Sequence, residues 1–132
     1  MTSPGGPWAP HLLGLVAAGG AAGSVLRYAV GIWCAQRFGA ELPWGTLAVN
    51  VAGSATIGLL GGLMIGGMSI TNETRLLLIT GVLGGFTTFS AFSLDVGLLA
   101  QRSAPTAFLY LMATLVLGLG AFALCFWLGR QV

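Results

Sequence analysis

The groups most able to bind an ion in this sequence stand in one short stretch, Gly-Gly-Phe-Thr-Thr-Phe-Ser at positions 84–90, inside an apolar run from Leu76 to Ala100. Glycine and β-branched residues are poor helix formers, so a helix through this run is expected to break near its middle. A break frees backbone carbonyl groups, which suit a hard cation, and N–H groups, which suit an anion. The stretch therefore predicts an ion site.

The residues that follow the break alternate aromatic and hydroxyl side chains at helical spacing. Both kinds recur every three residues: Phe86, Phe89 and Phe92, and Thr87, Ser90 and Ser93. The rim of an aromatic ring carries partial positive charge, so rings presented edge-on could touch a small anion without holding it too tightly to conduct it. Plain packing is the common role of such a stripe, but the neighbouring break and hydroxyls favour an ion path.

Two other apolar runs carry polar residues in rows of four-residue spacing, which places each row on one face of a helix. The rows are Thr46, Asn50, Ser54, Gly58, Gly62 and Gly66, and Tyr110, Thr114, Gly118 and Phe122. Their glycines are typical of close helix packing in membranes. Their polar residues would either hydrogen-bond neighbouring helices or line a path for ions, and each row taken alone favours the first interpretation.

Arg27 lies between apolar runs, in a row with Gly19, Gly23 and Gly31. A charge at such depth needs a partner or a route to the membrane surface. Asp95 is the one acidic residue within the apolar runs, so an Arg27–Asp95 ion pair is one hypothesis. The other is that the permanent charge of Arg27 raises the positive potential of a vestibule for anions.

The overall composition places these residues in a membrane. Of the 132 residues, 56% are hydrophobic and only 6% are charged, whereas soluble domains carry about 25% charged residues. The 22 glycines would weaken a soluble helical protein but allow helix backbones to approach closely in lipid. The scattered arginines form no basic patch, which disfavours nucleic acid as a partner. No ATP motif, covalent nucleophile or metal-ligand cluster indicates an enzyme.

Four segments are long enough to cross a bilayer, which takes about 20 apolar residues. They run from about Leu12 to Trp33, Trp44 to Met68, Leu76 to Ala100 and Thr106 to Leu128. We therefore predict an all-α integral membrane protein with four transmembrane helices, the third broken in mid-span. Residues 1–11, rich in proline and glycine, are expected to form a disordered head, and residues 12–132 the four-span domain.

The arginines near the span ends predict no preferred orientation in the membrane. Arg37 and Arg102 fall on one side of the four-span arrangement, and Arg75 and Arg130 on the other. Since loop arginines orient a membrane protein, two against two allows insertion in both directions. Chains inserted both ways can form an antiparallel homodimer, and a four-span monomer encloses too little space for a pore of its own.

Three segments together resemble the Fluc (CrcB-type) fluoride channels, namely Gly84–Ser93, Gly45–Asn50 and Gly20–Tyr28. The similarity extends over nearly the whole chain past the head, including its length and its number of spans. The resemblance implies a dual-topology antiparallel homodimer with two fluoride pathways, located in a bacterial plasma (inner) membrane.

The resemblance also assigns roles to residues of this chain. The anion pathway predicted on this basis comprises Thr46, Asn50, Phe89, Ser90, Phe92, Tyr110 and Thr114, with Arg27 as a vestibule or structural charge. The family carries a further hydroxyl where this chain has Gly118, so part of that polar track is missing here. A structural sodium ion is implied at the dimer interface, held by the carbonyls of Gly84 and Thr87 from both subunits. Which of Ser54, Ser90 and Ser93 touches the anion stays open.

The function implied by the resemblance is passive export of fluoride. Fluoride enters a cell from acidic surroundings as the neutral weak acid, dissociates and is trapped, and a channel lets the anion leave down the membrane potential, which reduces its toxicity. A proton-coupled multidrug exporter could share the four-span dimeric design, but it needs a titratable acid in the first span, which has none. A non-transporting assembly subunit, with the glycine rows as docking surfaces, is the other alternative.

Overall fold

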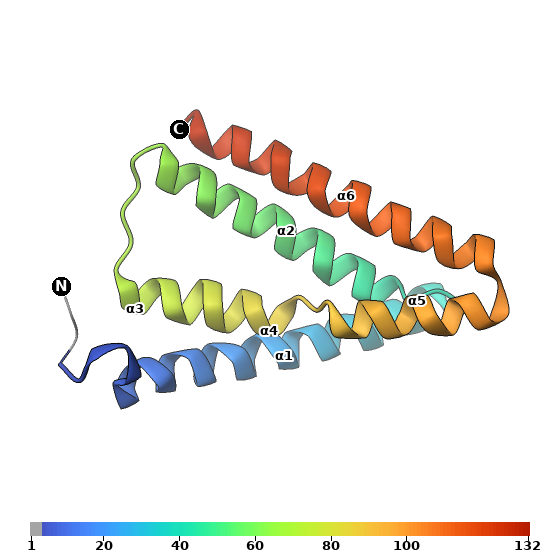
Figure 1. Cartoon of the computed structure of the whole chain (residues 1–132), viewed down its shortest axis with the longest axis horizontal. Helices are drawn as coiled ribbons and strands as arrows, with labels where there is room; N and C mark the ends of the chain where they lie inside the picture. The colour runs from blue at the N-terminus through green and yellow to red at the C-terminus, as the bar shows by residue number, and fades with distance from the viewer. Residues whose placement is uncertain (1–3) are drawn as a thin grey trace.

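The computed structural model describes residues 4–132, which form helices joined by short turns (Figure 1). A 3-10 turn, η1 (Gly6–Trp8), precedes four long segments that run back and forth along one axis. These are α1 (Pro10–Phe38), α2 (Trp44–Ile65), the segment Asn72–Arg102 and α6 (Ala104–Arg130). In Figure 1, α2 lies beside α6, α1 lies along the third segment, and the two chain ends are at the same end of the molecule.

The four predicted spans are confirmed as helices that are long and apolar enough to cross a membrane. Their ends differ from the predicted ones by at most five residues. The largest difference is at the end of α1, which continues to Phe38 before Gly39 ends it with a φ of 86°, whereas α2 stops earlier than predicted, at Ile65. The disordered head stays a prediction. Its first three residues lie outside the described part of the chain, and α1 already begins at Pro10.

The third segment is the irregular one, as predicted, and it bends. It consists of α3 (Asn72–Arg75), a π-helical stretch η2 (Leu76–Leu83), α4 (Gly84–Phe86) and α5 (Ser90–Arg102). Between α4 and α5 the backbone of Thr87 is extended, with φ −89° and ψ 159°. A π-helical stretch is rare and frequently occurs at functional sites, and this one begins at Leu76, well before the break at Thr87.

Glycines bring the helix backbones together in pairs. In α1, Gly19 and Gly23 are buried against η2, and a Cβ atom on either would collide with a backbone oxygen of that stretch. In α2, Gly58 and Gly62 are buried in the same way against the backbone of α6. The glycine rows are therefore packing surfaces, which is the role that small residues have in membrane helices.

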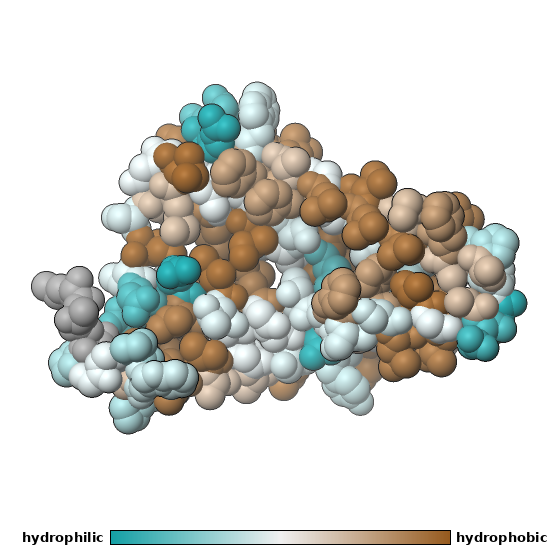
Figure 2. All heavy atoms as spheres, viewed as in Figure 1, coloured by the Kyte–Doolittle hydropathy of each residue, from teal (hydrophilic) through white to brown (hydrophobic). Residues whose placement is uncertain are grey.

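Polar side chains gather mainly at the two ends of the molecule, and apolar side chains cover much of the face between them (Figure 2). At the end away from the chain termini, Arg102 donates a hydrogen bond from Nη2 to the carbonyl oxygen of Glu41, 2.5 Å away, which joins the two loops there. Arg37 closes α1 at this end, while Arg75 and Arg130 stand at the other. The even division of arginines between the two ends is thus a property of the folded chain.

Candidate ion site at the helix break

Two threonines, Thr87 and Thr88, hydrogen-bond to the backbone on the two sides of the break between α4 and α5. The N–H and the hydroxyl of Thr87 both donate to the carbonyl oxygen of Leu83, at 3.0 and 2.8 Å, which ends the first half-helix. The hydroxyl of Thr88 accepts a hydrogen bond from the N–H of Ala91 at 3.1 Å. A threonine oxygen bonded to the N–H three residues later resembles an N-cap contact, and α5 begins two residues further on, at Ser90, as a new helix.

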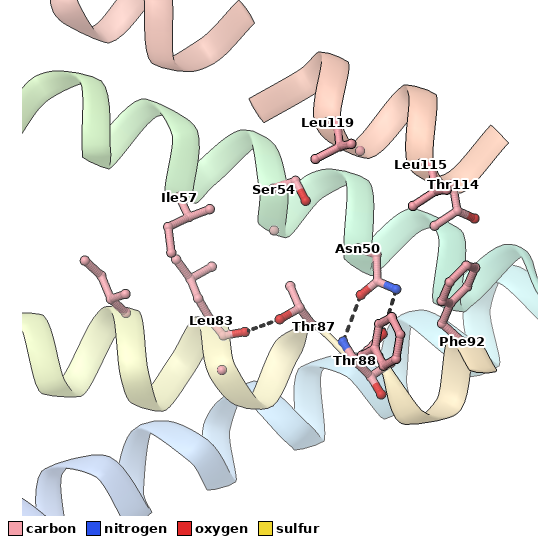
Figure 3. A pocket seen from close by; sticks show the side chains of 15 residues that line it. Asn50, Ser54, Ile57, Leu83, Thr87, Thr88, Phe92, Thr114, Leu115 and Leu119 are labelled. Atoms are coloured by element: carbon pink, nitrogen blue, oxygen red, sulfur yellow. Dashed lines mark hydrogen bonds between the residues drawn. The ribbon is translucent and has the colours of Figure 1, made fainter. Parts of the chain in front are cut away.

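The side chain of Asn50 in α2 hydrogen-bonds to the backbone of the break (Figure 3). Its Nδ2 donates to the carbonyl oxygen of Thr88 at 2.8 Å, and its Oδ1 accepts from the N–H of Thr88 at 2.8 Å. The side chain thus replaces both hydrogen bonds that a continuous helix would have given the backbone N–H and C=O of Thr88. A backbone group left unpaired in lipid would cost several kcal/mol, so this paired contact explains how the break is tolerated.

Arg27 of α1 supports the break from another side. Its Nε donates to the carbonyl oxygen of Gly85 at 3.0 Å, and a hydrogen bond from a charged donor is stronger than a neutral one. Asp95 accepts instead from the hydroxyl of Tyr110 at 3.5 Å. The structure therefore gives Arg27 and Asp95 different partners, and the Arg27–Asp95 ion pair considered above is not formed within the chain.

Two backbone carbonyls at the break lose their helical donors. The N–H of Thr88, which would bond to the Gly84 carbonyl in a helix, goes to Asn50. The N–H of Ala91, which would bond to the Thr87 carbonyl, goes to the Thr88 hydroxyl. Gly84 and Thr87 are the two positions predicted to hold a cation, and unwound carbonyls of this kind can coordinate sodium. Within residues 4–132 no group of three His, Cys, Asp or Glu side chains could hold a metal.

A groove of about 530 Å³ opens beside the break and is lined by α2, α6 and the third segment. Figure 3 shows side chains that converge on it from α2, α6 and the third segment. Its lining combines the polar residues Asn50, Ser54, Thr87, Thr88 and Thr114 with glycines and apolar side chains, Gly53, Ile57, Ile79, Leu83, Gly84, Phe89, Phe92, Leu115, Gly118 and Leu119. Most of the predicted pathway residues are therefore brought to one place, from parts of the chain far apart in sequence.

Thr114 is the polar group in this groove whose bonding is incomplete. It is only 8% exposed, and its hydroxyl oxygen is the buried side-chain polar atom without a hydrogen-bond partner in residues 4–132. A buried hydroxyl without a partner costs free energy of about 1–3 kcal/mol. The side chain of Tyr110 is a polar neighbour of it within the fold, and a hydroxyl at the wall of a groove can donate to an anion.

The two phenylalanines of the predicted pore differ sharply in position. Phe89 is 78% exposed, whereas Phe92 is 6% exposed and packs on Tyr110 with ring centroids 5.6 Å apart. The two rings lie edge to face, 6.0 Å between centroids. Phe89 therefore extends away from the fold and Phe92 is part of its small core, although both line the groove.

The remaining predicted residues lie elsewhere. Thr46 and Arg27 line a second, smaller groove of about 390 Å³, which also reaches Thr88. Tyr110 is buried behind Phe92. Ser90 is exposed at the first position of α5 and does not line either groove, so the predicted set divides between two grooves, the small core and the surface.

Sequence reasoning missed two features of the groove. The backbone of Thr88 is the partner of Asn50, a pairing between residues 38 positions apart that no local pattern indicates. Gly53 is buried opposite Thr87, and a Cβ atom on it would collide with the Thr87 methyl group. Its position three residues after Asn50 places it on the same helix face, which is the one signal that could have found it.

The four apolar helices, the interrupted third segment and the polar groove beside it define a small multi-pass membrane protein of the transport class, in which broken helices build ion sites. The chain belongs to the CrcB family, because residues 14–129 match the family model described as CrcB-like protein, Camphor Resistance (CrcB). The resemblance drawn from the three sequence segments is thereby confirmed.

The curated relatives agree with this family. The chain is 51% identical over 122 residues to the fluoride-specific ion channel FluC of Agrobacterium fabrum, covering 91% of this chain and 97% of the relative. It is 53% identical over 110 residues to FluC of Rhizobium meliloti, with 83% and 87% covered. FluC of Nitrobacter winogradskyi is 47% identical over 107 residues, with 80% and 85% covered. These relatives are named as ion channels and not as enzymes.

Proposed function

We propose that this protein is a fluoride-specific channel that exports fluoride passively across the bacterial inner membrane and so reduces its toxicity. The observation that carries the proposal is the groove at the helix break, where the buried Thr114 hydroxyl has no partner in the described chain. Relatives about half identical over most of their length are named fluoride-specific ion channels, which supports fluoride as the ion.

The chemistry of the groove suits a small anion that must also leave. Its polar groups are hydroxyls, an amide and the N-terminal end of α5, which favour negative charge without carrying a full positive one. The exposed ring of Phe89 and the buried ring of Phe92 add aromatic edges. Since conduction requires binding weak enough to release the ion, partial charges are better suited to this path than Arg27, whose Nε is engaged by Gly85.

The same proposal includes an antiparallel homodimer. The groove is open on the monomer, and Phe89 projects from its edge with 78% of its surface exposed. A second copy, inverted in the membrane, would cover this exposed aromatic ring and turn each groove into a closed path. The even division of arginines between the two ends supports insertion in both directions.

A structural sodium ion at the dimer interface also fits the break. The carbonyls of Gly84 and Thr87 have lost their helical donors to Asn50 and Thr88, and two from each subunit would present four oxygen ligands. When bound, the cation would neutralise these carbonyl dipoles and hold the two breaks together. The residues thus suit the group that the resemblance implies.

Fluoride release from vesicles tests the channel. The full chain is reconstituted into liposomes loaded with potassium fluoride, a potassium ionophore balances the charge, and a fluoride electrode follows release against protein-free vesicles. Rapid release that depends on the protein is expected. Release no faster than from protein-free vesicles would reject the proposed function.

Orientation and sodium are tested separately. Reporter fusions at the C-terminus should report both sides of the membrane, and a single clean orientation would reject the antiparallel dimer. Purified dimer kept in sodium should dissociate less at a given dilution than dimer kept in N-methylglucamine, and equal dissociation in both would reject the sodium site.

A further inference from the structure

The hydroxyls that line the groove come from α2 as well as from α6. Along α6 the row runs from Tyr110 to Thr114 and then to Gly118, which is buried and has no side chain. A path along α6 would therefore lose its hydroxyls after Thr114. Figure 3 shows Ser54 of α2 facing the same groove, and its Oγ lies 3.8 Å from the place where a Cβ of Gly118 would be.

Ser54 is free to act in the groove. A helical serine or threonine commonly bonds to the carbonyl four residues earlier, and Thr56, two residues further on, does this with Ala52 at 2.8 Å. In the described part of the chain Ser54 makes no such bond, and its side chain lines the groove. Because Asn50 commits Oδ1 and one Nδ2 hydrogen to the backbone of Thr88, the uncommitted donors on the α2 and α6 side of the groove are its second Nδ2 hydrogen and the hydroxyls of Ser54 and Thr114.

We propose that Ser54 is an anion contact, and that its hydroxyl takes the place of the one missing from α6 at Gly118. The ion would pass from the Thr114 hydroxyl on α6 to the Ser54 hydroxyl on α2, so the polar track changes helix at this point. Gly118 makes this exchange sterically feasible, because the bare position leaves the Ser54 hydroxyl uncovered. This inference rests on the proposed function and assigns one further residue to the same path.

Three variants of the full chain test the proposal by fluoride release from liposomes. Ser54→Ala is expected to slow release about tenfold, which is the size of effect expected for one hydrogen bond to a charged group. Ser54→Thr keeps the hydroxyl and is expected to conduct within about twofold of the parent. The pair Ser54→Ala with Gly118→Ser returns a hydroxyl from the opposite helix and is expected to recover most of the flux.

A merely structural role for Ser54 would not produce that recovery. Thr56→Ala removes a hydroxyl from the same helix that bonds within the helix, and it is the matched control with unchanged flux. Parent-like flux in Ser54→Ala, or a double variant no faster than Ser54→Ala, would overturn the proposal. If Ser54→Ala is not recovered as folded protein, Ser54→Cys is tested in its place. A thiol is a weaker hydrogen-bond donor than a hydroxyl, so the flux should again fall, and parent-like flux would overturn the proposal.

The two hypotheses fail differently. If the unmodified chain releases no fluoride, the proposed function fails as a whole. If the unmodified chain conducts and Ser54→Ala conducts equally well, the channel stands and only the role of Ser54 is rejected.

Discussion

The two halves of the contact between α2 and α6 share one four-residue spacing but have opposite structures. In the half near the chain termini, Gly58 and Gly62 press against the backbone of α6, and no room remains for a side chain. In the other half, Asn50 and Ser54 of α2 and Thr114 and Gly118 of α6 line a groove of about 530 Å³ together with the third segment. The row of residues on α2 therefore packs directly against α6 in one half of the helix pair, the closed half. In the other half, the open half, it lines the groove.

The difference lies in what stands opposite each position. A glycine opposite a backbone carbonyl allows close contact, which is how membrane helices gain packing without a hydrophobic driving force. At Gly118 an added Cβ atom would meet only the Ser54 hydroxyl, 3.8 Å away, so the two helices are less tightly packed there. The closed half thus keeps the two helices together, while the open half can expose hydrogen-bond donors at a depth where water is otherwise absent.

The largest effect is expected from a larger side chain at a glycine of the closed half. Gly62→Leu would place a side chain against the carbonyl oxygen of Phe126, and backbone that cannot yield makes this cost more than about 3 kcal/mol. We expect little monodisperse protein in size-exclusion chromatography after detergent extraction. Gly120→Leu, at a position with open space around it on α6, is the matched control and should extract normally, and equal behaviour of the two variants would contradict the tight packing.

The open half depends on Asn50. In Asn50→Asp the carboxylate can still accept from the N–H of Thr88, but it can no longer donate to the Thr88 carbonyl. One unpaired backbone carbonyl costs about 1–3 kcal/mol, and the added negative charge repels an anion. Fluoride release should fall at least about tenfold, with a lower thermal unfolding midpoint.

Normal fluoride conduction in Asn50→Asp would show that the side chain at position 50 lies outside the anion pathway. Thr56→Asn provides the matched control for a polar substitution on the same helix, because Thr56 is exposed away from the groove, and it should keep parent-like flux in the same assay.

Variants of Phe89 and Phe92 can distinguish a role in packing from a role in conduction. Phe92→Ile removes a ring from the core contact with Tyr110, so we expect lower flux and a stability loss of about 1 kcal/mol. Phe89→Ile alters an exposed ring and is expected to lower flux with unchanged monomer stability. Thermal unfolding beside vesicle flux measures both, and unchanged flux in both variants would reject their role in the pore.

The smallest effect is expected from Gly118→Ala. The added Cβ would stand 3.8 Å from the Ser54 hydroxyl, an ordinary contact, so stability should change by less than about 1 kcal/mol. Gly62→Ala, with its backbone collision, is the comparison, and its unfolding midpoint should fall clearly below that of Gly118→Ala. Equal midpoints would mean that the two halves of the helix pair do not differ in packing.

The local pattern of the sequence was enough to predict four spans, an interrupted third helix and glycine packing rows. Hydropathy, helix propensity and four-residue spacing are properties of one segment at a time, and they place residues such as Asn50, Ser54 and Thr114 on definite helix faces. The sequence also predicts that Arg27 needs a partner, because a charge at that depth is costly wherever it lies.

The partners themselves were decided only by the tertiary structure. Arg27 bonds to the Gly85 carbonyl instead of Asp95, and Asn50 bonds to the backbone of Thr88. Phe89 and Phe92 share one pattern yet differ in exposure from 78% to 6%. Spacing along a helix determines which face a residue occupies, but the rotation and height of the neighbouring helix determine what that face meets, and these depend on packing across the whole fold.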